Sequence, residues 1–169
     1  MGSTVSFVRD GDALIVVDPG MVKERAAILT PLQALGVGPE EITDVVISHH
    51  HPDHTVNIAL FPNARVHDNW AIYQGDTWID RPAEGFTISP GVTLAETPGH
   101  TPQDITTLVT TDAGLYACTH LWWDATGPDE DPLAADPAAL RESRARILSL
   151  DPATIVPGHG GAFAAKELG

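Results

Sequence analysis

The chain has few of the features that mark secreted, membrane-bound or nucleic-acid-binding proteins. Cys118 is the only cysteine among 169 residues, so no disulfide can form within the chain. No apolar run approaches the roughly 18 residues of a membrane-spanning helix. Basic residues are also scarce: nine Lys and Arg stand against 23 Asp and Glu, which gives a formal net charge of −14. Because a field of that sign repels phosphate backbones, nucleic acid is not expected as a partner.

What remains is the composition of an ordinary globular protein, with 43% hydrophobic residues. The length suits one domain with a sizeable core, and we expect residues 1–169 to form a single domain. A strand is expected to begin near Thr4, so no signal peptide is predicted. Together with the single cysteine, this makes the cytoplasm the expected location, with no membrane partner.

Short strands dominate the expected secondary structure. Apolar or alternating runs bounded by Gly, Pro and Asp predict strands at residues 4–8, 13–17, 44–47, 64–67, 87–88, 92–96, 105–110, 115–119 and 153–156. Helical spacing predicts helices at residues 22–35, 55–60 and 138–150. Pro31 is expected to break the first helix or to begin a new first turn, and residues 69–75 are expected to form a helical turn or a loop.

The most informative segment follows the expected strand at residues 44–47 and reads S-H-H-H-P-D-H. Side chains of an extended chain repeat every two residues, so His49 and His51 point to the same side. Asp53 and His54 come next, at the turn into a helix. Imidazole nitrogens and a carboxylate oxygen are ligands that Zn²⁺ favours. The segment therefore predicts a metal site.

Three further histidines stand where expected strands end in turns: His100, His120 and His159. Two of these turns share the sequence Pro-Gly-His, in which Pro and Gly set a tight turn and the imidazole projects from it. Turns at strand ends can meet at one edge of a sheet, so we expect these histidines to join the first motif. Only His50 and His67 fall outside this pattern.

The H-x-H-x-D-H motif after a strand, the later Pro-Gly-His and the closing Pro-Gly-His-Gly resemble the metallo-β-lactamase superfamily. The segment Val17-Asp18-Pro19-Gly20 resembles the second-strand signature of that family. Residues 136–159 are similar to a small subgroup named metallo-β-lactamase-domain-containing protein 1. The resemblance covers nearly the whole chain. It implies an α/β fold of the α+β kind, a four-layer αββα sandwich with a metal site at the edge of the sheets.

Carried over residue by residue, the resemblance implies two metal sites. The first set of ligands is His49, His51 and His100, and the second set is Asp53, His54 and His159. Zn²⁺ is the implied cofactor, one or two ions per chain, with iron and manganese as further candidates. Asp18 resembles an Asp that supports the family's site from behind, although an Asp that caps its own turn is an equal alternative.

One position departs from the family pattern. The family usually has Gly-Asp after the strand at residues 115–119, and that Asp bridges the two metals, whereas His120 occupies its place here. An imidazole cannot bridge two ions as a carboxylate can. His120 is either a terminal ligand of the second site, or a sign that this site is weak or empty, or an unligated acid or base. We favour terminal ligation, because neutral imidazole is a common metal ligand.

Other residues have plainer interpretations. Cys118 lies in an apolar strand and is expected to be a small buried hydrophobe. Trp122 and Trp123 could line a substrate pocket, although packing of at least one of them in the core is the stronger expectation. Tyr73 could donate a hydrogen bond to a leaving group or an oxyanion.

The implied activity is a metal-dependent hydrolase that uses a zinc-bound hydroxide on a small ester, thioester, lactone or related substrate. Asp53 and His120 are the candidate catalytic residues, since Asp53 could accept a proton or orient the hydroxide. One alternative is a mononuclear iron sulfur-dioxygenase-like enzyme, and another is a metal-binding module that His120 has made catalytically impaired. An uncovered edge strand near the N-terminus would also allow a homodimer.

Overall fold

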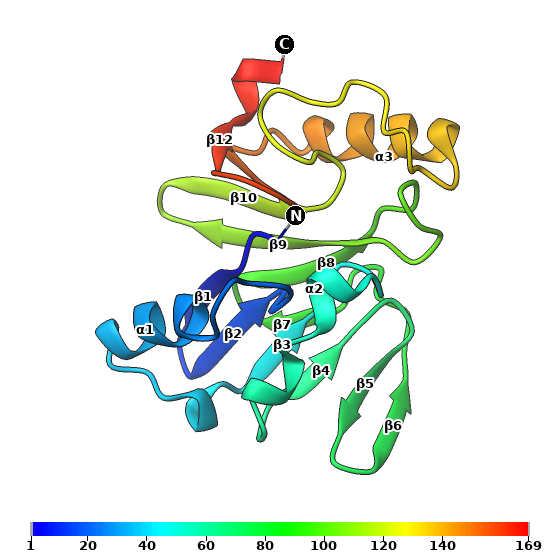
Figure 1. The fold of residues 1–169 in the computed structure, drawn as a ribbon. Coiled ribbons are helices and arrows are strands. Elements are labelled where there is room, and N and C mark those ends of the chain that lie inside the picture. Colours follow the sequence, from blue (N-terminus) through cyan, green and yellow to red (C-terminus); the bar gives the residue numbers. More distant parts are fainter. Residues whose placement is uncertain (1, 169) are drawn as a thin grey trace.

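Two six-stranded sheets form the centre of the computed structural model, which describes residues 2–168 (Figure 1). Across the first sheet the order is β1 (Ser6–Asp10), β2 (Ala13–Val17), β3 (Asp44–Val46), β4 (Arg65–His67), β5 (Ala71–Gln74) and β6 (Thr77–Asp80). Across the second it is β12 (Phe163–Ala164), β11 (Thr154–Pro157), β10 (Gly114–Thr119), β9 (Ile105–Thr111), β8 (Val92–Glu96) and β7 (Thr87–Ser89). The helices are α1 (Ala26–Ala34), α2 (Pro52–Thr55) and α3 (Pro137–Ser149), with 3₁₀ turns η1 (Pro39–Glu41), η2 (Ile58–Leu60) and η3 (Ala165–Leu168).

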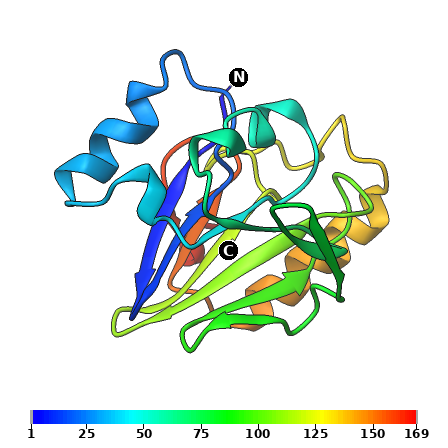
Figure 2. The same ribbon diagram turned by 90° about the horizontal axis from the view of Figure 1, so that it is seen from below.

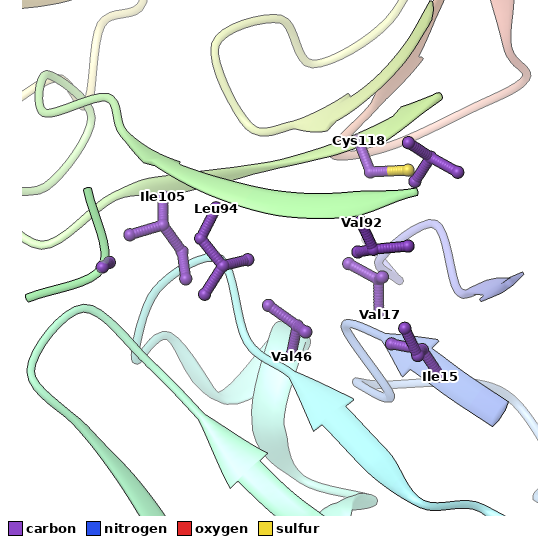
Figure 3. Close-up of a cluster of buried hydrophobic side chains, with 9 residues drawn as sticks. Ile15, Val17, Val46, Val92, Leu94, Ile105 and Cys118 are labelled. Atoms are coloured by element: carbon purple, nitrogen blue, oxygen red, sulfur yellow. The ribbon is translucent and has the colours of Figure 1, made fainter. Parts of the chain in front are cut away.

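Alternation of side chains along the strands divides the core into three apolar layers. In β2, Ile15 packs in the layer between the sheets, whereas its neighbour Val16 packs in the layer under α1. In β10, Cys118 packs between the sheets and Ala117 packs in the layer under α3. Figure 3 shows the middle layer, and Figure 2 shows α1 and α3 on opposite sides of the two sheets. The fold is therefore the expected four-layer αββα sandwich.

Parallel pairing determines where the turns that carry histidine lie. In the first sheet β2 pairs parallel with β3, and in the second sheet β10 pairs parallel with β11. Since the carboxyl ends of parallel strands lie at the same edge, the segments after β2 and β3 begin side by side, as do those after β10 and β11. Ser48 accepts a hydrogen bond from Ile105 N at 2.9 Å, which joins the two sheets at this edge.

The helices differ in detail from the expectation. α1 begins at Ala26 and continues through Pro31, so the predicted break is wrong. Ile28 and Leu32 are buried against the first sheet, and this packing compensates for the backbone hydrogen bond that Pro31 cannot donate. α2 begins at Pro52, so Asp53 and His54 lie within its first turn rather than before the helix.

Residues 69–75 were expected to form a helical turn or a loop, and this prediction is wrong. β5 pairs antiparallel with β4 on one side and with β6 on the other. All four residues of β6 are exposed, so no apolar alternation marks this strand in the sequence. The hairpin extends away from the body of the sandwich (Figure 1). Among residues 2–168, no helix is both long enough and apolar enough to cross a membrane.

His67, at the end of β4, makes stability sensitive to acid. Its side chain is fully buried, and Nε2 lies 2.7 Å from Oδ1 of Asp44. Burial lowers the pKa of His67 from 6.5, although the hydrogen bond to Asp44 opposes that shift. The folded protein thus keeps His67 neutral below pH 6.5, where the unfolded chain takes up a proton, so stability is lost as pH falls below that value.

We predict that His67→Gln, which can still donate to Asp44 but cannot titrate, flattens this dependence. Between pH 6.5 and 5, the free energy of unfolding of the parent should fall more steeply than that of the variant, by up to about 1.4 kcal/mol per pH unit. Urea unfolding with chelator present measures both slopes. Equal slopes would show that His67 takes up its proton in both states.

Candidate metal centre

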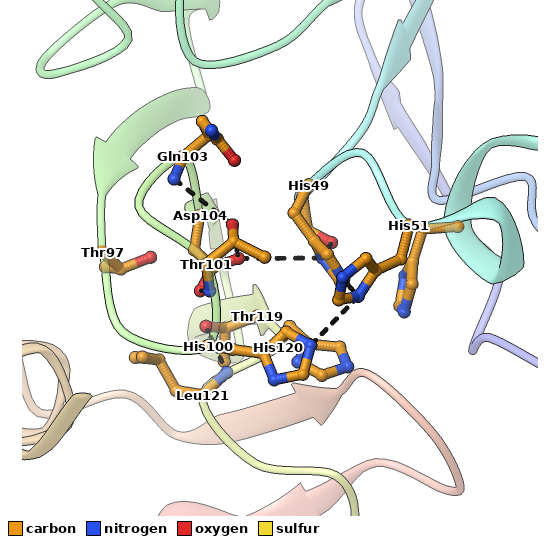
Figure 4. Close-up of polar contacts among 12 residues, drawn as sticks. His49, His51, Thr97, His100, Thr101, Gln103, Asp104, Thr119, His120 and Leu121 are labelled. Atoms are coloured by element: carbon orange, nitrogen blue, oxygen red, sulfur yellow. Dashed lines mark hydrogen bonds and ion pairs between the residues drawn. The ribbon is translucent and has the colours of Figure 1, made fainter. Parts of the chain in front are cut away.

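Six imidazole rings from four segments meet at the edge of the sandwich, and neighbouring ring centroids lie 4.2–5.3 Å apart. This histidine cluster consists of His49, His51, His54, His100, His120 and His159. Figure 4 shows four of its members side by side. His50 and His67 lie outside it, as their sequence context indicated, because they face the carboxylates of Asp68 and Asp44.

The first set brings three nitrogen atoms together. Nδ1 of His51 lies 2.9 Å from Nε2 of His49 and 3.1 Å from Nε2 of His100. A single proton on His51 can satisfy only one of these two contacts, so a lone pair faces another nitrogen at about 3 Å. A cation between the three rings would remove that conflict. The geometry therefore fits a metal ion held by three imidazoles.

The second set brings one carboxylate oxygen and two imidazole nitrogens together without direct hydrogen bonds between them. Oδ2 of Asp53 lies 3.6 Å from Nε2 of His54 and 3.7 Å from Nε2 of His159, too far for hydrogen bonds. Nε2 of His54 is buried without a hydrogen-bond partner. A buried acceptor that lacks a partner is costly, and a cation between the three side chains would satisfy it.

His120 lies between the two sets. Its Nε2 is 3.2 Å from Nε2 of His159, and its ligand atom also lies close to those of His49 and His54. Burial, followed by the neighbouring imidazoles, lowers the pKa of His120 to about 2, so the ring is neutral and can ligate. Gly158 makes this placement possible, because a Cβ there would lie 2.3 Å from Cδ2 of His120.

Asp18 connects both sets from behind. Its Oδ2 accepts hydrogen bonds from Oγ of Ser48 at 2.7 Å and from Nδ1 of His54 at 2.9 Å. With its proton donated to Asp18, Oγ of Ser48 accepts from Nδ1 of His49 at 3.0 Å. The proton of both imidazoles is thereby held on Nδ1, and both Nε2 lone pairs face the centre. The side chain of Asp18 thus binds groups 30 and 36 residues away, not its own turn.

The pKa values of His49 and His54 are shifted in opposite directions. Burial, followed by the neighbouring imidazoles, lowers the pKa of His49 far below its ordinary value. Burial would also lower the pKa of His54, but the hydrogen bond from Nδ1 to Asp18 and the charge of Asp18 outweigh it and raise this pKa. Next to His49, burial raises the pKa of the Asp104 carboxyl to about 6, although Thr101 donates two hydrogen bonds to it.

Two other acceptors orient His100 and His159, and no sequence pattern indicates either of them. Nδ1 of His100 lies 2.6 Å from Oδ2 of the buried Asp131, and Nδ1 of His159 lies 2.9 Å from the carbonyl oxygen of Gly2. Each contact places the proton on Nδ1 and leaves Nε2 for a metal. Asp131 is one of several acids in an irregular loop, and only the folded chain distinguishes it.

Four other residues that the sequence singled out are Tyr73, Cys118, Trp122 and Trp123. The Tyr73 hydroxyl donates to Asp68 at 2.7 Å, so it is not free to assist a leaving group. Cys118 is buried, and burial raises the pKa of its thiol to about 12, as expected for a small hydrophobe. Trp122 is buried under α3. Trp123 lies nearer the cluster, with its ring 6.3 Å from that of His159.

Comparison with known proteins agrees with this geometry. A sequence profile of the metallo-β-lactamase superfamily matches residues 1–94. The chain belongs to the metallo-β-lactamase superfamily. Metallo-β-lactamase domain-containing protein 1 of Xenopus laevis is 32% identical over 161 residues, which cover 90% of this chain and 69% of that protein. The human protein of the same name is 36% identical over 158 residues, which cover 88% of this chain and 59% of that protein.

Solved structures share the fold. One similar structure is a protein in a di-iron-bound form, with a TM-score of 0.73 and 23% identity, covering 96% of this chain and 89% of that one. Another is a quorum-quenching N-acyl homoserine lactone lactonase, with a TM-score of 0.70 and 22% identity, covering 90% of this chain and 77% of that one. Identities this low establish the sandwich fold alone.

We predict that Asp18→Asn weakens metal binding at both sets by about 10- to 100-fold. The substitution disturbs the hydrogen bonds that hold the protons of His49 and His54 on Nδ1. Asn is the chosen replacement because Asp18 has φ = 52°, a conformation that Asn tolerates. Competition with a chelator measures both affinities, and Asp112→Asn, in the exposed turn between β9 and β10, is the matched control. Unchanged affinity in Asp18→Asn would contradict the role given to this carboxylate.

Proposed function

We propose that this protein is a metal-dependent hydrolase, with Zn²⁺ as its ion, that cleaves a small ester, thioester or lactone. The observation that supports the proposal most strongly is the pair of ligand sets, in which four imidazoles have Nδ1 hydrogen-bonded to groups outside the cluster and Nε2 turned toward the other ligand atoms. An ion held by three protein ligands keeps a position for water, lowers the pKa of that water and polarises a carbonyl oxygen.

The residues of the chain supply the rest of the chemistry. His51 is exposed whereas His49 is buried, so substrate would approach the first set from the His51 side. Oδ2 of Asp53 faces His54 and His159, which leaves Oδ1 to orient the attacking water or accept its proton. The net charge of −14 disfavours polyphosphate substrates, and uncharged lactones or esters meet no such repulsion.

A metal-holding module without turnover is the second candidate function. The observation that favours it is His120, a neutral imidazole between the two sets where the family has a bridging carboxylate. Without that negative charge, two dications repel each other more strongly, so we propose that the second ion binds more weakly than the first.

The direct test of the hydrolase proposal is an assay of protein stripped with a chelator and reloaded with Zn²⁺, Fe²⁺ or Mn²⁺. We expect Zn²⁺ to restore hydrolysis of a panel of p-nitrophenyl esters, thioesters and acyl homoserine lactones. His49→Ala should reduce it to background because the first set loses a ligand. His50→Ala, the adjacent histidine whose imidazole faces Asp68, is the matched control and should retain its metal.

The outcomes separate the candidate functions. Turnover that needs Zn²⁺ supports the hydrolase. Oxygen uptake with Fe²⁺ alone would favour an iron dioxygenase, and tight metal binding without turnover on the whole panel would favour the module.

We further predict opposite effects of two changes at His120. His120→Asp introduces a carboxylate between the sets and should increase the affinity for the second ion, whereas His120→Ala should decrease it. Metal titration followed by elemental analysis of the bound protein measures both. If both variants bind the second ion as the parent does, His120 is not a ligand.

A further inference from the structure

The segment between β10 and α3 carries His120 at its start and Asp131 near its end. One side chain of α3, Arg144, joins the start of this segment to its middle. Nε of Arg144 donates to the carbonyl oxygen of Leu121 at 2.8 Å. The two terminal nitrogens donate to the carbonyl oxygens of Asp129 and Pro128. The guanidinium also lies 5.6 Å from the centroid of the Trp122 ring.

Only an arginine can make this set of contacts at one position. Its guanidinium presents five N–H donors in a rigid planar fork, and the three carbonyl groups only accept. A lysine offers one ammonium on a flexible stem and cannot span all three oxygens with the same geometry. Burial lowers the pKa of Arg144, and the nearby carboxylates of Asp131 and Asp129 oppose that shift.

The segment that Arg144 holds continues to Asp131, whose side chain contacts the proposed metal ligand His100. Oδ1 of Asp131 accepts from Leu133 N at 2.8 Å, and Oδ2 faces Nδ1 of His100 at 2.6 Å. The backbone that follows also contacts the His100 turn, because Ala135 N donates to the His100 carbonyl oxygen at 3.0 Å. The position of Asp131 is therefore set by a chain of contacts that starts at Arg144.

The same helix supports the His100 turn directly. Oγ of Ser143 donates to the carbonyl oxygen of Pro98 at 2.8 Å. Gly99 packs so closely that a Cβ there would lie 2.5 Å from Cα of Leu140. α3 thus fixes the backbone of His100 through Leu140 and Ser143, and it fixes the imidazole partner of His100 through Arg144.

We propose that Arg144 is a positioning residue for the first metal set: it holds the loop that brings Asp131 onto Nδ1 of His100, so that Nε2 of His100 stays directed at the ion. This inference rests on the metal binding proposed above. It assigns to Arg144 an effect on one set, through one ligand, rather than a general effect on the fold.

The first test is the affinity of the first Zn²⁺, measured by chelator competition on folded variants. Loss of groups that orient a ligand typically costs 10- to 100-fold in metal affinity, and we expect about tenfold for Arg144→Ala. Arg144→Lys should bind nearly as weakly, because the charge remains but the fork is lost. Arg141→Ala, at an exposed position of the same helix, is the matched control and should bind as the parent does.

A double-mutant cycle tests the path. If Arg144 acts through Asp131, the variant carrying Asp131→Ala and Arg144→Ala should bind no more weakly than Asp131→Ala alone. Unchanged affinity in Arg144→Ala, full rescue by lysine, or losses that multiply in the double variant would each overturn the proposal. Circular dichroism and thermal unfolding identify any variant that is not folded, and such a variant is replaced by Arg144→Gln.

A second readout does not need metal. In the metal-free protein, ¹⁵N–¹H correlation spectra of the imidazoles report which nitrogen carries the proton. His100 should be protonated at Nδ1 in the parent and in Arg141→Ala, and should become a mixture of tautomers in Arg144→Ala. An unchanged tautomer would overturn the proposal. If the parent binds no ion, the proposed function fails, while these spectra still decide the role of Arg144.

Discussion

The arrangement of the candidate site depends on one buried carboxylate. Asp18 follows β2, and its hydrogen bonds to Ser48 and His54 hold the segment after β3 against the end of β2. Through Ser48 it also fixes the proton of His49, so the same group orients one ligand of each set. Without it, either nitrogen of these imidazoles could carry the proton, and the Nε2 lone pairs would not be kept for a cation. Gly20 allows the backbone after β2 to lie close to α2, because a Cβ at this position would collide with the carbonyl oxygen of Asp53.

The sandwich turns residues that are distant in sequence into neighbours. Parallel pairing of β2 with β3 and of β10 with β11 places histidine-bearing turns at one edge of each sheet, and the middle apolar layer holds the two edges together. Each buried aliphatic side chain of this layer contributes about 1.5–3 kcal/mol. A stable apolar interior therefore supports a polar cluster that is costly by itself, since each of its six imidazoles packs against others of the cluster.

Much of this could be predicted from the sequence, and the exceptions have physical reasons. The ligand candidates were recognisable because metal chemistry restricts residue types and spacing, as in the run from His49 to His54. Apolar periodicity predicted most of the strands and helices, whereas the four layers were implied by the resemblance to the family. β6 was missed because its exposed side chains leave no alternation, and the break at Pro31 was wrong because packing of Ile28 and Leu32 outweighs a local preference. Asp131 and Arg144 could not be found because their roles come from contacts between a loop and a helix, which no local pattern records.

The central claim is that neutral imidazoles and one carboxylate hold divalent ions at this edge. X-ray absorption spectroscopy of Zn²⁺-loaded protein, combined with elemental analysis, tests it most directly. We predict two bound equivalents with only nitrogen and oxygen neighbours at about 2.0–2.2 Å. Protein that retains no zinc, or a zinc spectrum with a sulfur neighbour from Cys118, would contradict the claim.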